Sequence, residues 1–278
     1  MEENKVKFDL ESRLREYMPS LFTLIGNRPF GWNNINKIAE RNFEKRSKEY
    51  WALQNDDEII DKRLIVEANL YDVIGSMREG DDFAKTLFTY FDLLLQHLGK
   101  MLSTYQKDLI CTTLKGFLID TDKNYRNYIG ELAVLNNCLN GDFDLVSLEE
   151  PMPNGKKIDF NLKHKISKKT QLVEVLNIHY NYLKEYTDDT LALEIKGKII
   201  DKLKDKTKND CDTEFYLVPV IWANYEQLKW ISSLYADKIN IQNKLVIEPS
   251  AFGCFTYPDG SQIYKFGTLS SLVLINEN

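Results

Sequence analysis

The sequence predicts an α+β or α/β protein in which an N-terminal helical region precedes a domain built on a mixed sheet. From about residue 35 to 118, apolar residues recur at helical spacing with few glycines or prolines. After residue 122, β-branched and aromatic runs alternate with helical segments in the order α, β, β, β, α, β, α, β. That order is typical of a central sheet covered by helices. We place the boundary after residue 120, which gives a helical region at 1–120 and an α/β domain at 121–278.

The helical region contains four amphipathic segments, each bounded by polar turn residues. They span residues 35–53, 57–77, 81–102 and 104–118. A shorter helix is expected at 10–18, while the aromatic, turn-rich segment at 27–34 is assigned no structure. We expect this region to provide a surface for a protein partner or for a second copy of the chain.

The second half begins with a helix over 124–141 that closes on Gly141, because glycine readily adopts the conformation of a helix C-cap. Strands follow at 143–149, 156–163 and 170–178, with a turn around Gly155 before the second strand. Beyond these we expect a helix at 191–209, a strand at 214–222, a helix at 225–239 and final strands near 244–249, 263–267 and 269–275.

Composition and charge restrict the classes of function. The formal net charge of −6 excludes a generally basic surface, so binding to nucleic acid requires a local basic patch. The N-terminus is charged, and no run of about 18 apolar residues occurs, so we expect a cytoplasmic protein with no membrane association. The cysteines are widely separated, which favours free thiols in a reducing compartment; they are Cys111, Cys138, Cys211 and Cys254.

Several nucleotide and metal motifs are absent from the sequence. Neither the G-x-x-x-x-G-K-[ST] phosphate loop nor a G-x-G-x-x-G following a strand occurs, which argues against nucleotide-driven and NAD chemistry. The three histidines, His97, His164 and His179, do not form an H-E-x-x-H zinc motif. A serine or cysteine nucleophile stays open, although no G-x-S-x-G elbow is present.

Three acidic residues form the candidate site. Asp159 and Glu174 each alternate with apolar neighbours on consecutive strands, so a hairpin through 164–169 allows the two carboxylates to face each other. Glu131 lies at the edge of the apolar stripe of the preceding helix, beside the small residue Gly130. Carboxylate oxygens are the ligands that Mg²⁺ prefers. The alternative is that each acid only marks the solvent face of a half-buried strand.

The sequence resembles the PD-(D/E)XK nuclease superfamily over residues 122–222. The resemblance lies in the order of elements: a helix with a glutamate, a strand, a strand with Asp159, and a strand with Glu174 before a lysine-rich helix. The resemblance implies a restriction-endonuclease-like domain that cleaves phosphodiester bonds of DNA or RNA. It also implies that Glu131, Asp159 and Glu174 hold Mg²⁺ or Mn²⁺.

Two positions depart from the pattern of that superfamily. Ile158 replaces the motif proline, and Leu176 stands where active members have a lysine that orients water and stabilises charge. The following helix offers Lys196, Lys198, Lys202 and Lys206 as substitutes. We take Lys198 and Lys202 as the displaced catalytic lysines. The alternative is a solvated helix face on which Asp201 and Asp205 pair with the lysines.

A basic ridge surrounds the predicted hairpin and could receive a phosphate backbone. Its lysines are Lys156, Lys157, Lys163, Lys165, Lys168 and Lys169, and His164 lies among them. Two hypotheses therefore remain. The first is a Mg²⁺-dependent nuclease, and the second is a catalytically inactive nuclease-fold protein that binds a protein or a nucleic acid. Leu176 favours the second hypothesis, whereas the three carboxylates favour the first.

Overall fold

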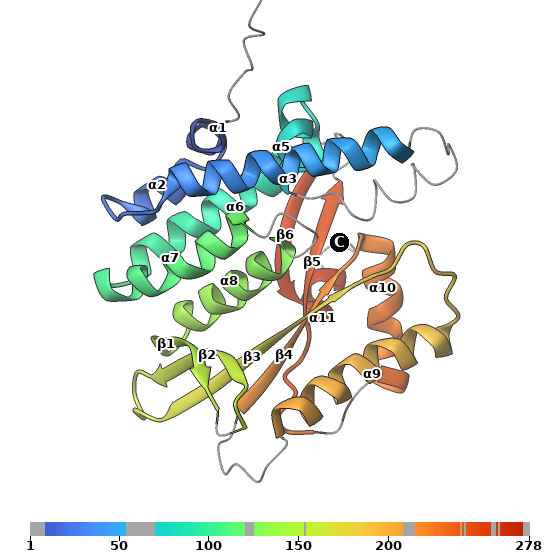
Figure 1. Cartoon of the computed structure of the whole chain (residues 1–278). Helices are drawn as coiled ribbons and strands as arrows, with labels where there is room; N and C mark the ends of the chain where they lie inside the picture. Colours follow the sequence, from blue (N-terminus) through green and yellow to red (C-terminus); the bar gives the residue numbers. More distant parts are fainter. Residues whose placement is uncertain are drawn as a thin grey trace, which may run out of the picture. The chain divides into compact units, whose positions relative to one another are not determined.

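The fold is that of a computed structural model of the chain, which describes residues 9–53, 70–119, 125–152, 154–207, 215–239, 241, 243–256, 260 and 262–274. The chain divides into two compact units, Met1–Tyr128 and Ile129–Asn278 (Figure 1). A helical first part is followed by a six-stranded mixed sheet with helices, which confirms the predicted fold class.

The regular secondary structure described in the first unit consists of helices joined by turns. Its helices are α1 (Leu10–Tyr17), α2 (Pro19–Ile25), α3 (Trp32–Leu53), α5 (Leu70–Glu79), α6 (Asp82–Met101) and α7 (Thr104–Ile119). Asp9 and Asp81 cap α1 and α6 by accepting hydrogen bonds from backbone N–H groups of the first turns. The predicted helix at 57–77 is seen from Leu70 onward, and its earlier part lies outside the described residues.

The unassigned aromatic segment of the first unit closes the turn between α2 and α3. Trp32 stacks on Phe22 with ring centroids 5.2 Å apart, and Phe30 contacts Trp32 in a tilted arrangement with ring centroids 5.0 Å apart. Gly26 and Gly31 adopt positive φ angles of 58° and 81°, which explains why the turn uses glycine at both positions.

The second unit is built on one sheet with the strand order β1-β2-β3-β4-β5-β6. The strands are β1 (Phe143–Pro151), β2 (Lys157–His164), β3 (Thr170–His179), β4 (Phe215–Trp222), β5 (Ser250–Thr256) and β6 (Gln262–Thr268). The helices are α8 (Tyr125–Asn140), whose first four residues belong to the first unit, α9 (Asp188–Thr207), α10 (Tyr225–Leu234), which continues as a π-turn over Tyr235–Ile239, and α11 (Leu269–Leu274). β3, β4 and β5 are parallel, and the remaining pairs are antiparallel.

Helices lie on both faces of this sheet. Leu172, Leu176 and Ile178 of β3 belong to the apolar core that includes the buried stripe of α9. That stripe consists of Leu191, Ala192, Ile195, Ile199 and Leu203. Asn177 points to the opposite face, where it lies against α8 at Gly130. β3 is therefore the strand whose side chains reach both α8 and α9.

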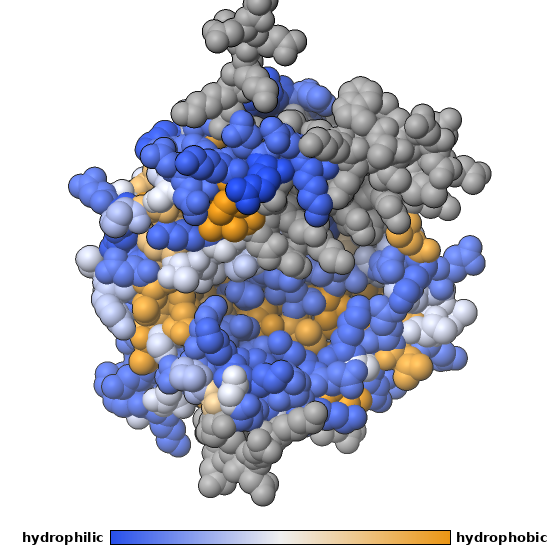
Figure 2. Space-filling model, in the orientation of Figure 1, coloured by the Kyte–Doolittle hydropathy of each residue, from blue (hydrophilic) through white to orange (hydrophobic). Residues whose placement is uncertain are grey.

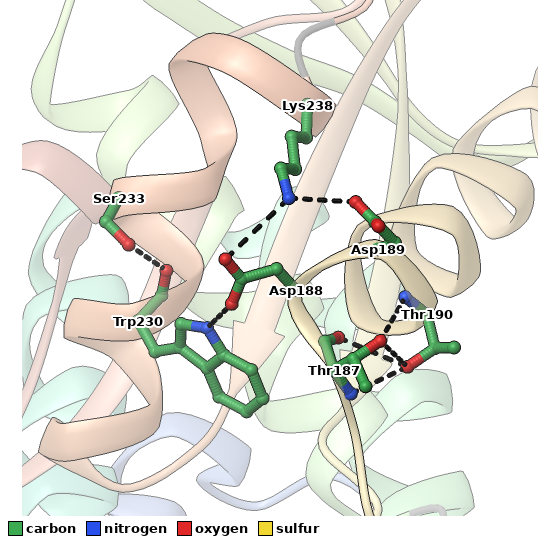
Figure 3. A network of polar contacts seen from close by, with 7 residues as sticks. All are labelled: Thr187, Asp188, Asp189, Thr190, Trp230, Ser233 and Lys238. Carbon is green, nitrogen blue, oxygen red and sulfur yellow. Dashed lines mark hydrogen bonds and ion pairs between the residues drawn. The ribbon is translucent and has the colours of Figure 1, made fainter.

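Helix α9 is fixed at its first turn by polar contacts (Figure 3). Thr187 and Thr190 exchange backbone-to-side-chain hydrogen bonds, as in a reciprocal capping box. Trp230 of α10 donates its indole N–H to Asp188 at 2.8 Å, and Lys238 contacts Asp189 at 2.8 Å. These contacts link the first turn of α9 to α10 and to the π-turn that follows it.

The central strand β4 contains Pro219, which lacks a backbone N–H. Leu217 bonds toward the β5 side, because its N–H donates to Leu245 and its C=O accepts from Ile247. Pro219, two residues further, is directed to the same side, and the β4–β5 pairing begins only at Val220 opposite Ser250. The missing donor thus falls in the gap between two points of contact, which explains how a central strand accommodates proline.

Two predictions for the C-terminal segment were wrong. The run at 244–249 forms only an isolated bridge at Val246, and the strand is instead β5, seven residues that begin at Ser250. The run at 269–275 is the short helix α11 rather than a strand. Thr268 accepts the Ser271 N–H at its start, and Leu269 and Leu272 are buried at i, i+3 spacing.

The molecular face in Figure 2 is largely hydrophilic, with separate hydrophobic areas. The most exposed of the large apolar side chains recorded for the described residues are Ile166, in the β2–β3 turn, and Leu193, on α9, which are 79% and 73% exposed. No helix within the described ranges is long and apolar enough to cross a membrane.

Candidate functional site

The candidate site lies where β2 and β3 separate. The two strands pair from Lys163 opposite Thr170 to Phe160 opposite Val173, and Asp159 and Glu174 are the next residues on each strand. There the side chain of Asp159 accepts the Val175 N–H through Oδ2 at 2.7 Å. A carboxylate therefore takes the place of a backbone acceptor at this point, which directs Asp159 toward β3.

Glu174 is almost fully buried, with 1% of its surface exposed, and it points toward α9. Its Oε1 lies 2.5 Å from Nζ of Lys202 and 3.0 Å from Nζ of Lys206. Its Oε2 is buried without a hydrogen-bond partner among the described residues. One oxygen of this carboxylate thus balances two ammonium groups, while the other retains unused acceptor capacity.

Lys206 is the more deeply placed of the two lysines. It is only 6% exposed, and its ammonium also donates to the backbone carbonyl of Lys157. The side chain of Lys202 is 30% exposed. Burial lowers the pKa of Lys202, but the ion pair with Glu174 and the nearby negative charge of Asp159 outweigh this effect and raise the pKa above its usual value.

The three predicted carboxylates influence one another electrostatically. Burial, followed by the negative charge of Glu174, raises the pKa of Asp159 to about 7, although the Val175 N–H and both lysines oppose the shift. Burial, followed by the charges of Asp159 and Glu174, raises the pKa of Glu131 well above its usual range. Glu131, Asp159 and Glu174 thus form an electrostatic cluster, in which the charge of Glu174 disfavours ionisation of Asp159 and of Glu131.

The chemistry of this cluster suits a divalent cation, although its present geometry is not that of a complete metal site. In the described part of the chain, no three acidic, histidine or cysteine side chains are arranged to hold a metal ion as they stand. The ligand atoms are nevertheless carboxylate oxygens, which Mg²⁺ and Mn²⁺ prefer. The unpartnered Oε2 of Glu174 could accept such an ion without displacing a lysine.

Of the two lysines selected from the sequence, only Lys202 reaches the carboxylates. Lys198 pairs instead with Glu194 on its own helix at 2.8 Å, and Lys184 contacts the same glutamate. These contacts lower the pKa of Glu194 to about 2, although its burial acts in the opposite direction. Asp205, expected as an intrahelical partner, pairs with Lys156 of the segment before β2 at 3.2 Å.

Lys206 was not selected from the sequence, but its helical position marks it. It lies seven residues after Ile199 and three after Leu203, and therefore on the buried stripe of α9. A lysine on an apolar stripe needs an anionic partner, since a buried unpaired charge is costly. Leu176, where the resemblance leads us to expect a lysine, packs against the apolar core as its chemistry requires.

The predicted basic ridge divides into two groups. Lys156 pairs with Asp205, Lys157 pairs with Glu149 at 2.6 Å, and Lys165 donates to the carbonyls of Leu139 and Gly141 at the end of α8. The others are exposed and have no ion-pair partner among the described residues; they are Lys163, Lys168 and Lys169.

Comparison with known proteins adds a distant structural similarity. No protein-family model matches the sequence, and no curated protein matches it. Among solved structures, the chain is similar to SfsA of Pyrococcus furiosus in complex with Ca²⁺, with 16% sequence identity and a TM-score of 0.24. The similarity covers 52% of this chain and 63% of that chain. Similarity at this level assigns neither a family nor an activity.

Proposed function

We propose that the second unit is a metal-dependent phosphodiester hydrolase, a divergent member of the PD-(D/E)XK nuclease superfamily that acts on DNA or RNA. The proposal is supported by the hydrogen bond and ion pairs that hold Asp159 and Glu174 where β2 and β3 separate, and by the electrostatic interaction of both acids with Glu131 of α8. A strand face that only contacts water does not bury a glutamate to 1% exposure between two lysines.

The carboxylates would hold Mg²⁺ or Mn²⁺, which would supply a metal-activated water and neutralise charge on the phosphate. Asp159 is oriented by the Val175 N–H through Oδ2, which leaves Oδ1 for a ligand. Lys206 and its bond to the Lys157 carbonyl hold Glu174 in place. Lys202 is the more exposed lysine, and we assign to it the contact with the substrate phosphate that Leu176 cannot make.

Calorimetric titration with Mg²⁺ and Mn²⁺ tests this proposal. We expect binding to the wild-type chain and its loss in Asp159→Asn and in Glu174→Gln. Glu194→Gln is a matched control, because Glu194 also pairs with two lysines but belongs to a separate set of contacts. Metal binding that is unchanged in both site variants, or absent from the wild type, would end the proposal.

Cleavage assays on single- and double-stranded DNA and RNA complete the test. Lys202→Met should abolish cleavage while preserving metal binding, because Lys202 contacts the substrate rather than the ion in this proposal. Lys198→Met is the control, since its ammonium pairs with Glu194. Equal loss of cleavage in both lysine variants would contradict the role assigned to Lys202.

A second candidate function is a nuclease-fold binding module without catalysis. The observation that favours it is the pair of ammonium groups on Oε1 of Glu174, which already compensates much of the negative charge that a metal would neutralise. Under this reading the titration gives no metal binding, and nucleic acid or protein binds with equal affinity in the presence and absence of EDTA.

A further inference from the structure

The turn between β2 and β3 combines unpaired positive charge with an exposed apolar residue. Lys163 is an exposed residue next to the end of β2, and Lys168 and Lys169 directly precede β3. Ile166 lies between them, and 79% of its surface is exposed. An isoleucine at the tip of a turn contributes nothing to the core of its own chain, so its apolar side chain is available to contact a partner.

The turn is held in a defined conformation. His164 accepts the backbone N–H groups of Ile166 and Ser167 on Nδ1 at 3.2 and 3.0 Å. The backbone of His164 bonds to Lys168 and Lys169, each at 2.9 Å, and Lys168 adopts a positive φ of 59°. Lys165 anchors the turn to the carbonyls at the end of α8. Ile166 is thus presented on a braced turn.

We propose that this turn contacts a nucleic-acid duplex, with Lys163, Lys168 and Lys169 on phosphates and Ile166 inserted as a wedge against the bases. This inference rests on the proposed nuclease function and specifies its substrate as duplex. Charge complementarity selects the partner, because the three lysines have no anionic partner among the described side chains, whereas Lys156 and Lys157 are neutralised. Apolar side chains flanked by cations are the means by which proteins unstack base steps.

The distance between the turn and the candidate site fits one duplex. His164 lies five residues further along β2 than Asp159, which corresponds to about 17 Å at the rise of a strand. A duplex aligned with β2 advances about 3.4 Å per base pair along one strand, so the turn would meet it about five base pairs from the scissile phosphate. Asp144 lies opposite Lys163 on β1 and reduces the local positive charge, so phosphate binding depends on Lys168 and Lys169 most strongly.

The salt dependence of duplex binding tests the lysines. In the full-length protein with EDTA, fluorescence anisotropy gives the slope of log affinity against log salt concentration. Replacing all three lysines, as Lys163→Gln, Lys168→Asn and Lys169→Gln, should reduce this slope by about 2 to 3, because each phosphate contact contributes about 0.9. The matched control, Lys156→Gln with Lys157→Gln, should leave the slope within about 0.5 of the wild type by the same rule.

The wedge is tested with duplexes that carry 2-aminopurine, whose fluorescence rises when it unstacks. We expect a rise at one position about five base pairs from the cleavage site, given the strand geometry. The rise should disappear in Ile166→Ser but persist in Leu193→Ser, a control at a similarly exposed apolar residue. The salt slope should be the same in wild type and Ile166→Ser, because isoleucine contacts no phosphate.

Each result separates this inference from the proposed function. Binding is measured without metal, so a turn-dependent slope in a protein that does not cleave would support the inference and refute the nuclease. Cleavage by a protein whose salt slope is unchanged in the triple variant would support the nuclease and refute the inference. Duplex DNA and duplex RNA distinguish the two substrates, whereas preferential binding to single strands or to anionic phosphatidylserine vesicles through the same residues would overturn the inference.

Discussion

Asp159 has a structural role through one carboxylate oxygen, in addition to its proposed role as a ligand through the other. Its Oδ2 accepts the Val175 N–H where the β2–β3 ladder stops, so this backbone donor is satisfied by a side chain. Replacement by alanine would leave the N–H unsatisfied and would confuse loss of structure with loss of function. Asparagine retains an acceptor at this position, which is why Asp159→Asn is the informative variant.

The raised pKa of Asp159, about 7, predicts a specific pH dependence of stability. An aspartate in an unfolded chain has a pKa of about 3.9, so the folded protein binds the proton more tightly. The resulting stabilisation is complete below about pH 4 and is lost as the pH rises through about 7. From pH 5 to pH 8 the free energy of unfolding should fall by about 2 to 3 kcal/mol, at 1.36 kcal/mol per pKa unit.

Urea denaturation at pH 5 and pH 8 measures this loss. Asp159→Asn should lose less stability between the two pH values, because its amide does not ionise. Asp205→Asn should behave as the wild type in this window, since the hydrogen bond from Lys156 lowers the pKa of Asp205. The same pH dependence in all three proteins would show that Asp159 does not carry a proton at pH 5.

The three lysines of one α9 face should differ in their contribution to stability. Lys206→Met should cost about 2 to 3 kcal/mol, because it removes a buried cation from a buried glutamate. Lys202→Met should cost about 1 kcal/mol, since its pair is partly exposed, and Lys198→Met less than about 0.5 kcal/mol. Thermal and urea unfolding give the order, and equal costs would contradict the different environments described above.

The acids were selected from short-range patterns, whereas the lysines were not fixed by any such pattern. The patterns are the strand alternation around Asp159 and Glu174 and the helix edge at Glu131, and in the structure the three acids interact electrostatically. Which lysine meets Glu174 depends on the rotation of α9 against the sheet. That rotation follows from packing of the stripe ending in Leu203 and Lys206, which a count of lysines on one face does not reveal.

At the scale of the element, the contact between α8 and β3 is set by a glycine. A Cβ at Gly130 would lie 2.0 Å from Oδ1 of Asn177, the atom that accepts the Trp222 indole N–H at 2.9 Å. Close approach at this point brings the helix that carries Glu131 toward the strand that carries Glu174. The glycine was noted in the sequence as a small residue, and its partner was not foreseeable from strand periodicity.

Gly130→Ala should therefore destabilise the protein by about 1 to 3 kcal/mol, because rotation of Asn177 leaves a buried indole N–H without its acceptor. Gly197→Ala is the matched control on α9. Nothing lies within 4 Å of a Cβ at that position, so alanine should stabilise the helix by about 0.5 to 1 kcal/mol. Thermal unfolding compares them, and a stabilising Gly130→Ala would refute the close approach.

The predicted type of element was wrong where the apolar run was short. The segment that forms α11 reads as a strand because it is rich in leucine and valine, yet its six residues are helical and capped by Thr268. Short apolar runs carry too few residues to distinguish a period of 2 from one of 3.6. The longer helices α3, α6, α7 and α9 contain enough turns for the period to be clear.

At the scale of the whole molecule, the three carboxylates of the cluster and the two lysines on Glu174 belong to the second unit, together with the core that supports them. A fragment of residues 121–278, which keeps α8 intact, should fold cooperatively and retain the metal affinity of the full chain. Circular dichroism, urea unfolding and calorimetry test this. A fragment that folds but fails to bind metal, while the full chain binds it, would show that the site needs residues of the first unit.

Pro219 has a consequence for how the sheet assembles. Parallel strands brought together from distant parts of the chain can pair in several registers during folding, and each is stabilised by the hydrogen bonds it completes. Any register that sets a β5 carbonyl opposite Pro219 forfeits one of those bonds, whereas the native pairing, which begins at Val220, loses none. Pro219 thus disfavours non-native registers of β4 and β5 during folding and favours the single register that completes the sheet beside the site.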